Sequence, residues 1–152
     1  MVDQQDRVYH GIQTGPESRH LPGPRILAHV LVEEAMTGPT ERVGVKVLRE
    51  LRGTETSGYG WGYNGTGTSN AAAAILADVL GLDAYAIRTA DWEYDPIARL
   101  REAFCSDFLS TACDQWRLRH GAILRWARGW YLQHGVTDLP QALVKLPEVP
   151  VS

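Results

Sequence analysis

The residues best suited to chemistry lie in one stretch, which runs from Gly58 to Leu80 and reads GYGWGYNGTGTSNAAAAILADVL. Five glycines alternate with aromatic and polar residues there before the chain enters an alanine-rich run. Glycine adopts positive φ at little cost, and the pair Asn64-Gly65 favours a tight turn. The stretch therefore predicts a constrained loop, and such a loop is a place to look for a binding site.

The alanine-rich run predicts a helix over residues 70–80. Its apolar residues recur at helical spacing, Thr68 and Ser69 offer hydroxyls for the N-cap, and Gly81 suits the C-terminal end. Because N–H groups at a helix N-terminus attract anions, we predict a site for a phosphate or carboxylate, with an aromatic ring stacked on a base. The predicted ligand-binding residues are Trp61, Tyr63, Asn64, Gly65, Thr66, Gly67, Thr68 and Ser69. The alternative is a tight turn capped by Thr68 or Ser69, with its aromatic rings buried against the helix.

A signature is formed by Tyr59, Trp61-Gly62-Tyr63 and Gly65-Thr66-Gly67, followed by the alanine- and leucine-rich run. It resembles an uncharacterised family of bacterial and phage domains of unknown function, over residues 43–109. Related sequences often carry an acidic residue where Gly60 stands and proline where Thr68 stands. The resemblance implies a role in a phage or mobile element, and it implies no catalytic residue.

The glycine spacing formally matches the fingerprint of dinucleotide-binding folds, but the context differs. No buried apolar strand precedes it, Trp61 separates the first two glycines, and no alternation of strands and helices follows. Thr66 stands where a phosphate-binding P-loop needs lysine. Neither of these two nucleotide-binding folds is predicted.

A second candidate site is the basic segment 115–136, which contains no acidic residue. Its formal charge is +4, against −7 for the rest of a chain whose total is −3. As one continuous helix, it would hold several arginines opposite Trp126 and Trp130. The predicted basic ridge comprises Arg117, Arg119, Arg125 and Arg128. It would bind nucleic acid, a phosphorylated small molecule or an acidic partner, and the alternative is an ordinary amphipathic helix.

No catalytic residue, metal site or cofactor is predicted. Asp91, Glu93 and Asp95 alternate along the chain, but Asp95 before Pro96 is better explained as a helix N-cap. The two cysteines, at 105 and 113, fall in one expected helix about 12 Å apart, which is too far for a disulfide.

The composition predicts one globular domain over residues 1–138 and a loosely ordered, proline-containing tail over 139–152. A hydrophobic fraction of 44% and a charged fraction of 22% are typical of such a domain. The net charge of −3 argues against a protein that coats nucleic acid. No apolar run of about 18 residues predicts a membrane span, and the polar N-terminus does not resemble a signal peptide, so a cytoplasmic protein is expected.

We predict an α+β fold in which a small antiparallel sheet from the N-terminal half packs against three or more C-terminal helices. Strands are expected over 7–12 and 42–51, and the alternating aromatics at 59–63 suggest another that would pair with the second. The apolar run 26–36 is interpreted as a helix, with a buried strand as the alternative. Helices are expected over 82–89, from Ile97 to Trp116, and over 123–134.

The predicted function is a non-enzymatic accessory binding protein that recognises an anionic ligand through the glycine-rich loop and the arginine-rich helix. One alternative is an inhibitor of a host protein that uses the tryptophan-rich helix as its contact surface. The other is a small enzyme that acts on a nucleotide. The pattern does not determine the oligomeric state.

Overall fold

A computed structural model of the chain describes residues 7–14, 23, 27–37, 43–52 and 58–146. In chain order the elements are β1 (Arg7–Ile12), β2 (His29–Thr37), β3 (Val43–Glu50), α1 (Thr66–Leu80), α2 (Ala84–Arg88), α3 (Pro96–Phe104), a π-helical segment (Cys105–Leu109), β4 (Gln115–Arg119), α4 (His120–Gln133) and α5 (Gln141–Val144).

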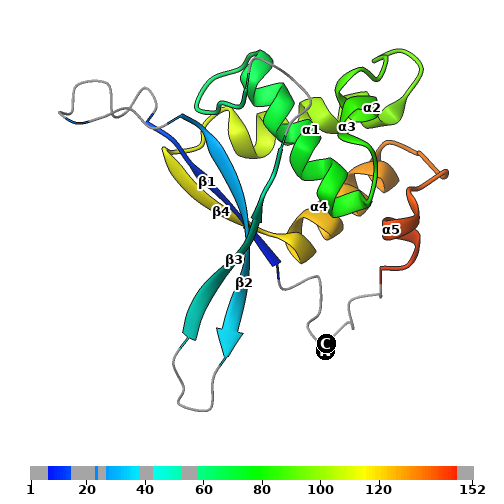
Figure 1. Ribbon diagram of the computed structural model, residues 1–152. Helices are drawn as coiled ribbons and strands as arrows, with labels where there is room; N and C mark the ends of the chain where they lie inside the picture. The colour runs from blue at the N-terminus through cyan, green and yellow to red at the C-terminus, as the bar shows by residue number, and fades with distance from the viewer. Residues whose placement is uncertain (1–6, 15–22, 24–26, 38–42, 53–57, 147–152) are drawn as a thin grey trace.

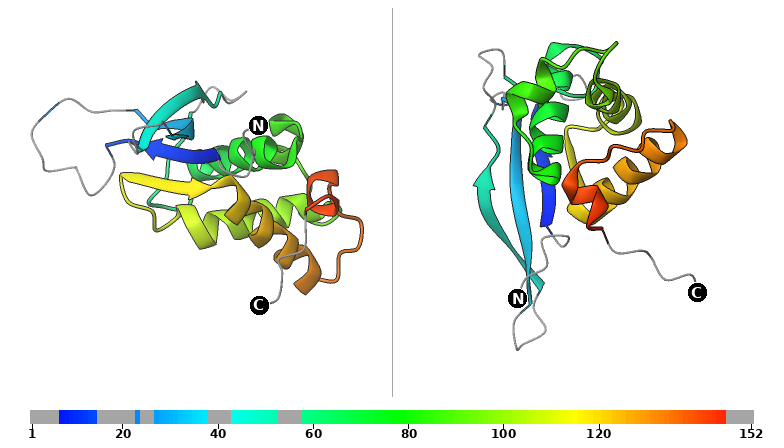
Figure 2. Two further views of the ribbon diagram at one scale, coloured as in Figure 1. Left: turned by 90° about the horizontal axis from the view of Figure 1, so that it is seen from below. Right: turned by 90° about the vertical axis from the view of Figure 1, so that its right-hand side faces the viewer.

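The strands form one sheet in the order β3-β2-β1-β4, and every neighbouring pair is antiparallel (Figure 1). The described helices all pack on one face of this sheet (Figure 2). The ends of β2 and β3 that lie toward residues 37 and 43 project beyond the helices. The predicted α+β fold is confirmed, although β4 comes from the C-terminal half of the chain.

The two faces of the sheet follow from the alternation of side chains along each strand. Tyr9, Val30 and Val32 are fully buried beneath the helices. The residues between them, such as Val8 and Leu31, therefore point to the opposite side, which we call the outer face. His10 and Glu33 also belong to this outer face by the strand register.

Helix α1 forms the centre of the core and contacts α2, α3, α4 and α5. It is buried on all sides, and its small alanines at 71–74 allow neighbouring elements to approach closely. Gly81 ends it in the left-handed conformation, with a φ of 69°, as predicted. The helix begins four residues before the predicted start, at Thr66, and Gly65 rather than Thr68 or Ser69 occupies the N-cap.

The interpretation of residues 26–36 as a helix is wrong, since His29–Thr37 forms the central strand β2; residue 26 lies outside the described residues. Leu31 on the outer face is apolar like its inward neighbours Val30 and Val32, so this run shows no period-two alternation and does not distinguish a strand from a helix. The strand predicted over 42–51 is confirmed as β3, but Val45 and Val47 face solvent rather than the core. The aromatic residues at 59–63 form a loop and no strand.

The continuous helix predicted from Ile97 to Trp116 is also wrong. Asp95 caps α3 and Pro96 begins it, as predicted, but the helix passes into the π-helical segment and the chain then reverses into β4. In the segment 139–152, predicted as a loose tail, α5 places Leu143 in the core and Leu146 is also buried; residues 147–152 lie outside the described part.

Candidate functional site

In the glycine-rich loop, Trp61 is fully buried. Its ring meets Trp116 edge to face, with centroids 5.2 Å apart. Gln13 donates a hydrogen bond from its side-chain amide to the carbonyl oxygen of Trp61. Because the ring is packed between the sheet and the helices, it presents no surface on which a base could stack.

Tyr63 lies against the glycines of the same loop, and 46% of its surface is exposed. A Cβ atom at Gly60 would lie 2.2 Å from the Tyr63 hydroxyl, and one at Gly67 would lie 2.6 Å from it. The contact therefore depends on the absence of side chains at these two positions. The glycines serve close packing of an aromatic ring here.

Several N–H groups of the loop are already hydrogen-bonded. Gly60 donates to the carbonyl of Gly67 at 3.1 Å, and Gly62 donates to that of Leu109 at 2.9 Å. The Thr68 hydroxyl donates to the carbonyl of Tyr63 at 2.7 Å and caps no helix N–H. Ser69 donates its N–H to Gly65, whereas no described residue accepts a hydrogen bond from the N–H groups at 66 and 67. Asn64 and Thr66 are exposed.

The four arginines of the predicted ridge do not share a helix, so the expectation of one continuous helix over 115–136 is wrong. Arg117 and Arg119 belong to β4, while Arg125 and Arg128 belong to α4. Arg125 is exposed, and Arg128 donates a hydrogen bond to the carbonyl of Leu146.

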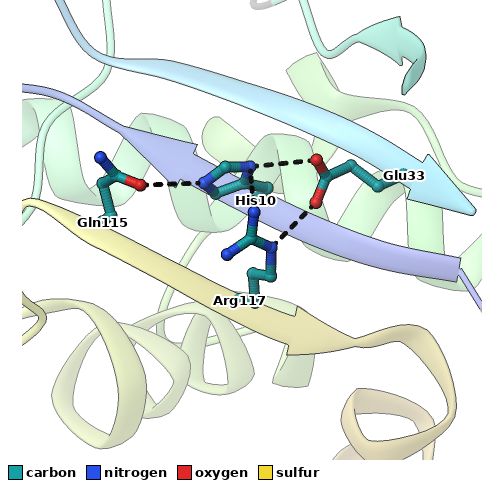
Figure 3. A network of polar contacts seen from close by, with 4 residues as sticks. All are labelled: His10, Glu33, Gln115 and Arg117. Atoms are coloured by element: carbon teal, nitrogen blue, oxygen red, sulfur yellow. Dashed lines mark hydrogen bonds and ion pairs between the residues drawn. The ribbon is translucent and has the colours of Figure 1, made fainter. Parts of the chain in front are cut away.

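Arg117 instead belongs to a polar cluster on the outer face of the sheet, which brings together side chains from β1, β2 and β4 (Figure 3). Its Nε donates to Oε1 of Glu33 at 3.1 Å, while Oε2 of Glu33 lies 3.1 Å from Nδ1 of His10. Nε2 of His10 lies 3.4 Å from Oε1 of Gln115. We call these four residues the outer-face cluster.

The outer-face cluster has a buried part and an exposed part. The side chains of His10 and Glu33 are each 7% exposed, whereas that of Arg117 is 55% exposed. Nδ1 of His10 also lies 3.3 Å from a terminal nitrogen of Arg117. When Nδ1 carries a proton it donates to Glu33, so both oxygens of that carboxylate are then paired. His10 thus fixes the position of the Glu33 carboxylate, and Glu33 in turn holds the Arg117 guanidinium through its Nε.

The direction of the β4 side chains is set by a contact on the opposite face of the sheet. Trp116 pairs with Gly11 across the strands, and its indole occupies the space where a Cβ of Gly11 would be, 2.2 Å from Cε2. With Trp116 turned toward the helices, the outer face receives Gln115, Arg117 and Arg119, each about 6.6 Å from the next. The result is a row of hydrogen-bond donors along β4.

The sequence alone identified Arg117 and Arg119 but not His10, Glu33 or Gln115. The sequence did predict a strand over 7–12, but it did not assign His10 to a face of the sheet. The partner strands were the missing information, because residues 26–36 and 115–119 were both expected to be helical.

The other candidate groups do not assemble into a site. Asp91 accepts a hydrogen bond from the N–H of Glu93, and Asp95 accepts one from the N–H of Ile97. Within the described ranges, no three His, Cys, Asp or Glu residues are grouped so as to hold a metal ion. Cys105 is buried, Cys113 is exposed, and both are free thiols. Among the described helices, none combines the length and the apolar character that crossing a membrane requires.

Comparison with known proteins gives a family. No curated protein and no solved structure matched the chain. A family model matches residues 32–129, which extend from β2 into α4 and include the glycine-rich loop, Glu33 and Arg117. Since the match covers more than half of the 152 residues, the chain belongs to the family of unknown function DUF6166.

Proposed function

We propose that this protein is a non-enzymatic binding module that docks an acidic, partly apolar segment of a protein partner on the outer face of its sheet. Arg117 and Arg119 are the anchors in this proposal. The observation that carries it is the outer-face cluster, in which a buried His10–Glu33 pair orients an exposed guanidinium.

Energetics support a role in recognition. Removing charges from water costs several kcal/mol per ion, and well-packed apolar residues often stabilise a fold equally well or better. Glu33 bears this cost on a face that no described helix covers. In return, Glu33 engages Nε of Arg117, which leaves terminal N–H groups available for a carboxylate of the partner.

The surroundings of the cluster favour a protein partner over nucleic acid. Val45 and Val47 on β3 are 56% and 52% exposed, so the same outer face also presents apolar surface, at the sheet edge opposite β4. At the outward positions of β1–β4 that the structure describes, no Phe, Tyr or Trp is present to stack on bases. A net charge of −3 also disfavours general attraction to a phosphate backbone.

The geometry supports binding better than acid–base catalysis. A His–carboxylate pair is common in active sites, where the second ring nitrogen faces the substrate. Here Nε2 of His10 faces Gln115, and the ring is nine-tenths buried. The exposed group is Arg117, which does not release its proton.

The test is an NMR titration of the full chain with a short peptide of alternating glutamate and valine. Amide shifts are expected at Val8, Val47, Arg117 and Arg119. The variant Arg117→Gln should bind roughly fivefold more weakly, as expected for loss of one solvent-exposed ion pair. Arg125→Gln, on α4 and away from the sheet, is the matched control and should bind normally.

A basic peptide and a single-stranded DNA serve as two further probes of the proposal. A lysine–valine peptide of the same length should produce no saturable shifts. Equal binding of both peptides, or equal loss in both arginine variants, would contradict docking on this face. If oligothymidylate shifts the β4 residues and the acidic peptide does not, the partner is a nucleic acid and the proposal fails.

The second candidate is an anion site at the N-terminus of α1. It is supported by the N–H groups of Thr66 and Gly67, which donate a hydrogen bond to no described residue. Titration with inorganic phosphate should then shift these two amides at millimolar concentration or below; unchanged amides would refute it. A role in a phage or mobile element is supported only by the resemblance of the Trp61–Gly67 signature.

A further inference from the structure

A cleft of about 520 Å³ lies among the helices, on the side of the sheet opposite the outer-face cluster. It is bounded by α2, the start of α3, the end of α4 and the segment 136–141. Much of its wall is apolar. The apolar side chains include Leu82, Ile87, Ile97, Val136 and Leu139.

The side chain of Tyr131 lines this cleft. Tyr131 is 3% exposed, and its hydroxyl forms no hydrogen bond with any described residue. Burial, reinforced by the charge of Asp95, raises the pKa of Tyr131 to about 12, so the phenol keeps its proton at neutral pH. With no partner among the described residues, this hydroxyl is open to a ligand group that enters the cleft.

The charged groups of the cleft are all acidic. Asp83, Asp95 and Asp138 line it, and no lysine, arginine or histidine does so among the described residues. Asp83 and Asp95 each accept one backbone N–H as N-caps of α2 and α3. These helix ends are therefore already capped, and an anion would meet three carboxylates.

N-capping explains two of these three acids but not the third. Asp138 is exposed and forms no hydrogen bond or ion pair within the described ranges. It lines the same cleft as Tyr131 and caps none of the described helices. The cleft thus combines an apolar wall, a protonated phenol and a carboxylate that the fold itself does not use.

We propose that this cleft binds a primary ammonium group that carries an apolar portion. The ammonium donates hydrogen bonds to the hydroxyl oxygen of Tyr131 and to the carboxylate of Asp138, while the apolar portion packs against Leu82 and Ile87. A free amine and the side chain of a partner's lysine share this chemistry.

The experiment is an NMR titration of the full chain with benzylamine and with two uncharged or anionic analogues, benzyl alcohol and benzoate. Benzylamine should shift the resonances of Ile87, Tyr131 and Asp138, with an affinity at least tenfold above those of both analogues. A blocked lysine derivative, N-acetyl-lysine methylamide, tests the second source; the tighter of the two amines identifies which source fits the cleft.

Variants then separate binding from folding. Asp138→Asn, which removes an exposed charge, should weaken benzylamine roughly three- to fivefold while leaving the unfolding midpoint unchanged. Tyr131→Phe should weaken it as well, and Glu34→Gln on β2 is the matched control for loss of an acid elsewhere. Equal affinity for benzylamine and benzyl alcohol, tighter binding of benzoate, or unchanged affinity in Asp138→Asn would each overturn the proposal.

Discussion

Gly60 and Gly67 both lie beneath the ring of Tyr63, but they differ in what else surrounds them. The three atoms nearest to a Cβ at Gly60 all belong to the end of the Tyr63 side chain, which is about half exposed and has solvent to move into. A Cβ at Gly67 would also lie 3.0 Å from the backbone nitrogen of Gly60. The backbone there is held by the hydrogen bond between these two glycines and cannot move aside easily.

We therefore predict that Gly67→Ala lowers the free energy of unfolding by about 1–3 kcal/mol, while Gly60→Ala costs less than about 1 kcal/mol. Gly129 on α4 has no atom near its Cβ direction, so Gly129→Ala should stabilise by about 0.5–1 kcal/mol. Urea unfolding followed by tryptophan fluorescence measures all three. Equal costs at 60 and 67 would show that the Tyr63 ring, rather than the backbone, limits the loop.

At this same scale the sequence predicted that the loop was constrained but not why. Aromatic and glycine residues suit both a ligand site and a packed turn. For Trp61 and Thr68 the structure gives the second use, since the ring is buried and the hydroxyl caps the carbonyl of Tyr63. Whether the loop is a ligand site or a packed turn depends on where Trp116 lies, and Trp116 is 55 positions after Trp61 in the chain.

Among the secondary-structure elements, β4 shows how a tertiary contact overrides local pattern. Its sequence, Gln115–Arg119, continues a helical stripe of apolar residues and is followed by a true helix. Trp116 nevertheless fits flat over Gly11 of β1, with Trp61 against its edge. The burial of this aromatic pair outweighs the modest helix preference of five residues.

This contact predicts strong coupling between β1 and β4. Gly11→Ala places a methyl group 2.2–2.5 Å from the indole of Trp116 and should destabilise the protein by about 1–3 kcal/mol. Trp116→Leu relieves that clash, so the two changes together should cost less than their sum by about 0.5–3 kcal/mol. A double-mutant cycle from urea unfolding gives this coupling, and additive costs would mean that the ring can be displaced freely.

The elements that were predicted correctly are those whose signals are local. A strand at 7–12, the helix ending at Gly81 and the cap at Asp95-Pro96 depend on alternation, glycine and proline within a few residues. The strand β2 was misassigned because its buried run looks the same in a helix. The outer-face cluster was missed for the same reason, since His10 meets Glu33 only once β2 is a strand.

Across the whole molecule, a buried thiol and two buried tyrosine hydroxyls make the stability of the fold depend on pH in the alkaline range. Burial raises the pKa of the Cys105 thiol from 9.0 to about 12 and that of Tyr131 from 10.0 to about 12. Burial also raises the pKa of Tyr9, whose hydroxyl donates to Asp78 at 2.6 Å, despite the opposing charges of Arg49 and Arg7. In each case the folded state keeps a proton that the unfolded chain releases at lower pH.

A group with a raised folded pKa contributes its full stability below the unfolded pKa and loses it as the pH rises. The melting temperature should therefore be level near neutrality, begin to fall at about pH 9 as Cys105 of the unfolded chain ionises, and fall more steeply above about pH 10. Tyr131→Phe removes one of the three acids and should flatten the fall above about pH 10 relative to the unmodified chain. Melting curves followed by circular dichroism across this pH range test the prediction. A melting temperature that stays constant to about pH 11 would contradict it, and so would an equally steep fall in the variant. Either result would mean that these groups ionise as readily in the folded protein as in the unfolded chain.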